Sequence, residues 1–142
     1  MKVTVFRFGA VALLSMTLLG CGGDGISYSE VTGTVKLKGV PLEKIQVEFI
    51  PTQKGHPSVA ITDARGFFAL KGQKGVHGAV VGKHKVVLRD TNLLGTTIGR
   101  KNEDVDFSIG KPKRISEKLG DLSTTPLDKE VLPGKNSFDF DL

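Results

Sequence analysis

The sequence predicts an all-β sandwich. Two observations lead to this fold class. From about residue 30 onward, apolar and polar residues alternate in short runs, which is typical of strands with one buried face. Turn residues separate these runs, and almost no stretch has helical spacing. Roughly seven short strands of this kind favour two packed sheets around one core.

The first two strands are expected at residues 31–38 and 42–51. The apolar face of the first contains Val31, Gly33, Val35 and Leu37. A turn at residues 38–41 joins the two strands, and Pro51 ends the second because proline cannot donate a ladder hydrogen bond.

The next two strands are expected to form a hairpin over residues 59–70. In its turn, Asp63-Ala64-Arg65-Gly66, the aspartate can accept hydrogen bonds from backbone amides and the glycine can adopt a positive φ. The alternation places Phe68 and Leu70 in the core and Phe67 on the surface.

A glycine-rich bend at residues 72–82 precedes a strand over residues 83–88. His84, Val86 and Leu88 lie on its apolar face, and the other face carries Lys83, Lys85 and Arg89. This basic row is interpreted as a solvated face, although an acidic partner or lipid headgroups could also bind it.

The C-terminal part begins with residues 91–114, which have weak periodicity and are expected to form a long irregular insertion. A short helical turn at residues 115–119, a strand at 127–131 and a turn at 133–136 follow. The final strand alternates Phe138, Phe140 and Leu142 with polar residues, so its apolar face closes the core.

The first twenty-one residues have the organisation of an export signal. Lys2 and Arg7 precede an apolar run, residues 8–19, which is too short to span a hydrocarbon core of roughly 30 Å. Small Gly20 then precedes Cys21, the only cysteine. Cleavage is therefore expected between Gly20 and Cys21.

The sequence Leu18-Leu19-Gly20-Cys21 resembles the lipobox of bacterial lipoproteins. The resemblance implies a diacylglyceryl thioether on Cys21, cleavage before it and acylation of the new amino group. Three acyl chains hold a protein firmly, whereas one chain of myristoyl length does so marginally. The chain would then be anchored to a membrane of the bacterial cell envelope, in a leaflet that the sequence leaves open. The alternative is a plain secretory signal whose cysteine is removed or left free.

This organisation gives a signal peptide (1–20), a flexible tether (21–29) and one domain (30–142). Removing the signal leaves 122 residues, a size that suits a single core. Without Lys2 and Arg7, 18 basic residues face 15 acidic ones, so the net charge is +3. With the two signs mixed along the chain, no Trp and a single Tyr, nucleic acid is not expected as a partner.

Several of these motifs, taken together, carry a resemblance to a known family. They are Val31-x-Gly33-x-Val35, Gly39-x-Pro41, Val47-x-Phe49-x-Pro51, Thr62-Asp63-x-x-Gly66-x-Phe68-x-Leu70 and Gly82-x-His84-x-Val86. In this order they resemble the carboxypeptidase regulatory-like, transthyretin-like β-sandwich. The tail, Thr124-Thr125-Pro126-Leu127 through Val131-x-Pro133-Gly134-x-Asn136-x-Phe138-x-Phe140-x-Leu142, is similar to that of small planctomycete lipoproteins built on this domain. The resemblance implies a seven-stranded Greek-key sandwich and no established activity, and residues 91–114 depart from the pattern.

No catalytic motif is present, and no cofactor or metal is expected. His56, His77 and His84 lie in separate segments without the spacing of zinc ligands, and His84 is expected to be a partly buried structural residue. A Gly-x-Ser-x-Gly elbow and a P-loop are both missing. The related hydroxyisourate hydrolases end in Tyr-Arg-Gly-Ser, whereas this chain ends in Phe140-Asp141-Leu142, so the sequence does not predict an enzyme.

Acidic residues cluster in two places. Glu103, Asp104 and Asp106 lie in the predicted insertion, and Asp139 and Asp141 project from one face of the last strand. A calcium site needs about six to eight oxygen ligands, and the chain has no Asp-x-Asp-x-Asp-Gly loop, so calcium is not expected. The two aspartates are interpreted as charges that discourage pairing between strand edges.

Two classes of function remain open. The first is a non-enzymatic, lipid-anchored accessory or protein-interaction domain of the cell envelope. The second is a carbohydrate-binding module or an accessory of a polysaccharide-processing system. Sugar sites usually stack on aromatic rings, and here only Tyr28, in the expected tether, and Phe67 are candidates. An active site assembled from separate loops is a third alternative.

Overall fold

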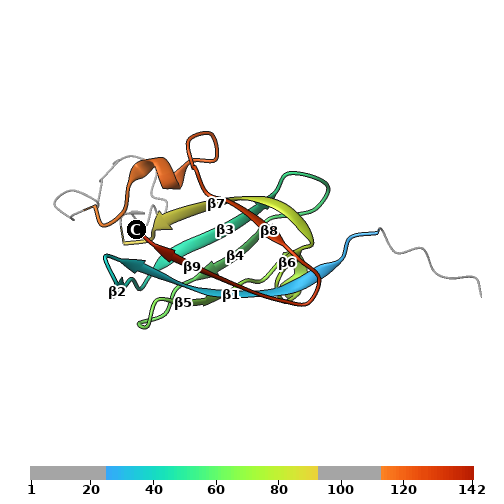
Figure 1. Cartoon of the computed structure of the whole chain (residues 1–142), viewed down its shortest axis with the longest axis horizontal. Coiled ribbons are helices and arrows are strands. Elements are labelled where there is room, and N and C mark those ends of the chain that lie inside the picture. The colour runs from blue at the N-terminus through green and yellow to red at the C-terminus, as the bar shows by residue number, and fades with distance from the viewer. Residues whose placement is uncertain (1–24, 93–112) are drawn as a thin grey trace, which may run out of the picture.

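The computed structural model describes residues 25–92 and 113–142, which form two β-sheets packed face to face (Figure 1). Seven of the nine strands in this part of the chain are longer than two residues. Its only helices are two short 3-10 helices, η1 (Gln73–Gly75) and η2 (Glu117–Gly120). The predicted all-β sandwich is therefore confirmed, and η2 lies where a helical turn was predicted.

The first sheet is built around β1 (Tyr28–Leu37). On one side of β1 lie three short antiparallel strands, β6 (Ala79–Val80), β5 (Phe67–Ala69) and β2 (Val40–Pro41). On the other side, β9 (Lys135–Asp141) runs parallel to it, from Glu30 opposite Lys135 to Lys36 opposite Asp141. A parallel pair between these two strands was not predicted.

The second sheet contains four antiparallel strands in the order β4 (Ser58–Ile61), β3 (Ile45–Pro51), β7 (Gly82–Asp90) and β8 (Asp128–Val131). The expected strand boundaries hold within a few residues. Pro51 is the last residue of β3, and β7 continues to Asp90, two residues beyond the predicted end.

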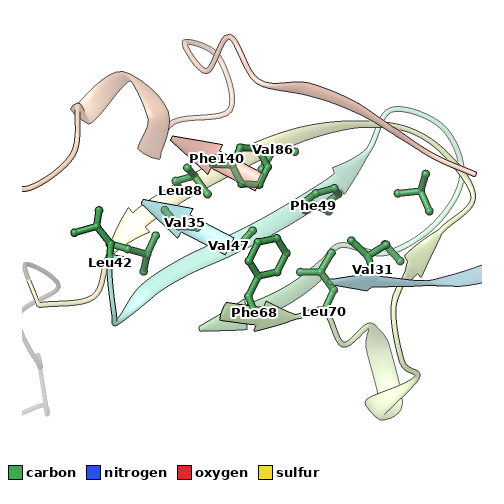
Figure 2. Packing of buried hydrophobic residues seen from close by; sticks show 13 residues of the cluster. Val31, Val35, Leu42, Val47, Phe49, Phe68, Leu70, Val86, Leu88 and Phe140 are labelled. Atoms are coloured by element: carbon green, nitrogen blue, oxygen red, sulfur yellow. The ribbon is translucent and has the colours of Figure 1, made fainter. Parts of the chain in front are cut away.

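The core lies between the two sheets and contains the alternating apolar residues of both (Figure 2). Phe68 of β5 stacks on Phe140 of β9, with ring centroids 6.2 Å apart. Phe138 of the same strand lies 5.6 Å from Phe49 in the opposite sheet. Phe68 is 1% exposed and its neighbour Phe67 is 39% exposed, so the predicted register of this segment is confirmed.

The predicted hairpin over residues 59–70 is wrong in its pairing. β4 pairs with β3 and β5 pairs with β1, so the two strands belong to different sheets, and only one bridge, between Val59 and Lys71, joins the two segments. Thr62 is the physical reason. This buried residue donates its hydroxyl to the carbonyl of Leu42 at 2.7 Å and accepts from the amide of Ile45 at 2.9 Å, which holds the end of β4 in the second sheet.

The turn itself forms as predicted, but it carries the chain from one sheet to the other. The Asp63 carboxylate accepts hydrogen bonds from the amides of Arg65 at 2.8 Å and Phe67 at 3.0 Å. These bonds hold the pKa of Asp63 below its usual value. Gly66 has a φ of 71°, in the left-handed region that favours glycine.

β1 begins at Tyr28, two residues before the predicted domain boundary. Tyr28 and Ser29, which were assigned to the tether, pair with Val80 and Ala79 of β6. Ser29 is buried, and its hydroxyl accepts a hydrogen bond from the amide of Gly134 at 3.2 Å. These contacts make both residues part of the sandwich.

The predicted irregular insertion falls largely on residues 93–112, outside the described residues. On either side of that segment, Arg114 holds Asp90 through two hydrogen bonds of 2.6 and 2.7 Å. The Asp90 side chain is 1% exposed, whereas that of Arg114 is 24% exposed. Hydrogen bonding to Asp90 raises the pKa of the Arg114 guanidinium, so Arg114 is positively charged at all ordinary pH values.

Candidate functional site

The structure keeps the three histidines apart. His56 lies in the exposed loop between β3 and β4, His77 lies before β6, and His84 lies in β7. Within residues 25–92 and 113–142, no group of three or more His, Cys, Asp or Glu side chains could hold a metal ion. Gly20 and Cys21, and the acidic residues Glu103, Asp104 and Asp106, lie outside the described residues.

His84 is a buried residue of the core face of β7, with 1% of its surface exposed. Its Nδ1 lies 2.9 Å from the carbonyl oxygen of Gly82, which assigns the proton of a neutral imidazole to Nδ1. Nε2 is buried without a hydrogen-bond partner, and the ring lies against Phe49 at 5.7 Å between centroids. Burial lowers the pKa of His84 because the charged form loses its solvation.

Two of the three basic residues in the predicted row on β7 form ion pairs with neighbouring strands. Lys85 pairs with Asp128 at 3.0 Å, and Arg89 pairs with Glu48 at 2.5 Å and donates to the carbonyl of Gly120 at 2.9 Å. Lys83 remains exposed. The row is therefore not one continuous positive surface.

Asp139 and Asp141 are exposed on β9, which pairs only with β1 in the described part of the chain. Asp139 accepts hydrogen bonds from the amide and the hydroxyl of Thr34 at 3.0 and 2.7 Å. Asp141 accepts from the amide of Gly39 at 3.0 Å. These carboxylates thus place negative charge on an edge strand, as predicted, and they also bind that strand to β1 through Thr34 and to the turn after β1 through Gly39.

The two aromatic candidates for sugar stacking have different surroundings. The Tyr28 ring is half-buried in β1 and lies against Gly72, where an added Cβ would come within 2.9 Å of the ring. Phe67 is 39% exposed at the start of β5. The two rings belong to different strands, Tyr28 to the start of β1 and Phe67 to the start of β5.

Sequence reasoning missed a concentration of lysines at one end of the sandwich. Three loops, the last taken with the first residue of β9, lie at the end from which the N-terminal segment leaves: 52–57, 71–78 and 132–135 (Figure 1). We call these loops the lysine-rich end. They contain four exposed lysines and no Asp or Glu: Lys54, Lys71, Lys74 and Lys135.

Two exposed apolar side chains accompany these lysines. Val76 is 42% exposed and Leu132 is 58% exposed. A groove of about 510 Å³ separates the N-terminal segment from the β3–β4 loop, and Ser27, Gln53, Lys54 and Lys83 are among the residues that line it. The amide of Val81 donates to the carbonyl of Ser27 at 2.8 Å, which fixes the N-terminal segment beside this groove.

The opposite end of the molecule has charges of both signs. Its loops and strand ends carry acidic residues beside lysines and arginines: Glu43, Asp63, Asp90, Glu117, Asp121 and Asp141. A second groove of about 550 Å³ at this end has apolar walls that include Leu37, Ile115, Leu119 and Leu142. The strand ends beside the lysine-rich loops carry two exposed carboxylates, Glu30 of β1 and Glu130 of β8. Lysines outnumber carboxylates at that end, whereas the opposite end mixes the two signs.

No family model, curated protein or solved structure matches this chain. In the part that the structure describes, no helix is long and apolar enough to span a membrane.

Proposed function

We propose that this protein is a lipid-anchored, non-enzymatic domain of the bacterial cell envelope with an accessory or protein-interaction role. The observation that carries the proposal is the sequence Leu18-Leu19-Gly20-Cys21, which ends four residues before Gly25, the first described residue of the chain. A basic start and an apolar run of signal-peptide length precede it.

The position of the N-terminal segment supports this proposal. The segment leaves the sandwich at the lysine-rich end, beside the groove, and not through a sheet face (Figure 1). An anchor attached there leaves both outer sheet faces and the opposite end accessible to other envelope proteins. The accessory role would be exerted through these surfaces.

We further propose that the sandwich is of the carboxypeptidase regulatory-like type. Two glycines of the motifs have a packing reason in this fold. An added Cβ at Gly33 would lie 1.9 Å from the carbonyl oxygen of Phe138, and one at Gly66 would lie 2.4 Å from that of Val35. Glycine at these positions therefore follows from close contacts between strands, as expected of motif residues that define a fold.

The anchor is tested by expressing the full chain in a bacterial host and measuring the intact mass and detergent partitioning of the product. The expected mass is that of residues 21–142 plus the acyl groups, and the product should enter the detergent phase. Cys21→Ser should remain an unprocessed, unacylated precursor, whereas the control Gly23→Ala should behave as the wild type. An unacylated, water-soluble wild-type product would overturn the proposal, and so would unchanged processing of Cys21→Ser.

A further inference from the structure

We propose that the lysine-rich end docks on the anionic lipid headgroups of the membrane that holds the anchor. This inference rests on the proposed acylation of Cys21. It adds an orientation to the anchored domain, because one end of the sandwich would lie against the membrane surface and the other would point away from it.

The segment between the proposed anchor and the domain is short. Gly25 follows Cys21 by four residues, and four residues span at most about 14 Å when fully extended. The screening length of charges at physiological ionic strength is about 8 Å. The N-terminal segment starts beside Lys54 and Lys83 in the groove, so the tether lets these lysines reach the headgroups. Because the extended tether is longer than the screening length, it does not by itself hold them there.

The charge of the lysine-rich end complements that of anionic headgroups. The three loops of the lysine-rich end present four exposed lysines without an acidic residue of their own. Lys135 has one carboxylate nearby, that of Glu30 at 3.8 Å, and both side chains are more than half exposed, so this pair is weak. Lysines close to an anionic bilayer surface are attracted to it. The opposite end, with mixed signs, has no comparable attraction.

Two exposed apolar residues lie beside lysines of this end. Val76 follows Lys74 by two residues in one loop, and Leu132 precedes Lys135 by three in another. An apolar side chain beside a lysine suits the membrane interface, because the apolar group enters the boundary with the acyl chains while the ammonium group stays among the headgroups. Exposed apolar side chains also occur away from this end, among them Val40, Ile61 and Leu122. Charge therefore distinguishes the lysine-rich end, and its two apolar side chains add to the contact there.

Docking is measured with the mature, acylated protein in vesicles of phosphatidylcholine, with or without added phosphatidylglycerol. Acylation consumes the only native thiol, so Leu132→Cys and Val40→Cys each provide one labelling site, at the lysine-rich end and at the opposite end. A fluorophore at position 132 should be quenched strongly by a lipid-bound quencher, only when phosphatidylglycerol is present, and high salt should reverse the effect. A fluorophore at position 40 should be quenched little in either membrane.

Charge reversal provides the matched variants. Lys74→Glu and Lys54→Glu remove lysines from the lysine-rich end, and Lys38→Glu and Lys118→Glu do so at the opposite end. Lys74 and Lys38 match closely because both are exposed and have a positive φ, 57° and 49°. Each substitution at the lysine-rich end should lower the docking equilibrium constant at least about fivefold, and the controls should leave it unchanged.

Two outcomes would overturn the inference even if acylation of Cys21 is confirmed. The first is equal quenching at both positions in the acylated protein, and the second is quenching at position 132 that is independent of phosphatidylglycerol and unchanged by Lys74→Glu. An unacylated product that does not float with the vesicles would instead overturn the anchor, and the docking proposal with it. Intact mass and flotation therefore separate failure of the anchor from failure of the docking.

Discussion

Replacing Gly33 by alanine tests the close contact between β1 and β9. The added Cβ would lie 1.9 Å from the carbonyl oxygen of Phe138 and 2.7 Å from Cζ of the Phe68 ring. Ordinary carbon–oxygen contacts in sheets are about 3.3 Å or longer. The two strands must therefore separate by more than about 1 Å, and the buried Phe68 ring must also move.

The cost follows from the rigidity of these neighbours. Overpacking a well-packed core costs about 1–3 kcal/mol when side chains can adjust. Here the closest atom belongs to the backbone of β9, which is held along its length by β1. Alanine recovers part of the loss, about 0.4–1 kcal/mol, because it restricts the unfolded chain. We expect Gly33→Ala to lower the free energy of unfolding by about 2 kcal/mol.

Urea unfolding, followed by circular dichroism, measures this change. Gly120→Ala is the matched control, because its Cβ would make only ordinary contacts, 3.7 Å from the carbonyl oxygen of Leu88 and 3.8 Å from Arg89. The control should change the free energy of unfolding by less than about 0.5 kcal/mol. Equal effects of the two substitutions would refute the argument that contact with β9 requires glycine at position 33.

Three further predictions concern single side chains. Phe68→Ala should cost about 3–5 kcal/mol of unfolding free energy, and Phe67→Ala less than about 1 kcal/mol, because only the first ring is buried; similar losses in urea unfolding would contradict the assigned register. Arg114→Met should lower the free energy of unfolding, measured in urea, by about 3 kcal/mol, because the buried Asp90 carboxylate loses its guanidinium partner. The double variant Arg114→Met, Asp90→Asn should recover part of this loss. Strictly additive effects of the two substitutions would show that the side chains do not interact. The pKa of His84 is lowered in the folded protein, so the stability that the neutral imidazole contributes should be complete above the unfolded pKa of about 6.5 and be lost as the pH falls below it. Between pH 8 and pH 5, the melting temperature should therefore fall less in His84→Phe than in the wild type. Identical pH profiles of the two proteins would argue against this assignment.

The strands and turns could be predicted because their signals are local. The alternation around Phe67 and Phe68 determines which ring is buried, and the Asp63 turn forms from bonds within five residues. Strand partners are not local. Thr62 binds residues 17 and 20 positions away and thereby places β4 beside β3, although a hairpin with β5 was the simplest expectation from the sequence.

The lysine-rich end could not be predicted from the sequence, because it too depends on which segments become neighbours. Lys54, Lys74 and Lys135 lie far apart in the sequence, and they reach one end of the molecule only because the strand directions place their loops there. The lack of acidic residues in all three loops is visible in the sequence. It indicates a positive surface only when the loops are known to be neighbours in the fold. The lipobox resemblance, in contrast, depends on adjacent residues and needs no fold.

The parallel pair of β1 and β9 has a consequence for the order of events during synthesis. The paired residues are 105 positions apart, from Glu30 and Lys135 onward. At a translation rate of about 5–20 residues per second, β9 emerges about 5–20 s after β1. Throughout that interval one edge of β1 has no neighbour and the core lacks Phe140. The nascent chain therefore stays incompletely folded until β9 appears, which is the state in which an export machinery or a chaperone can bind it.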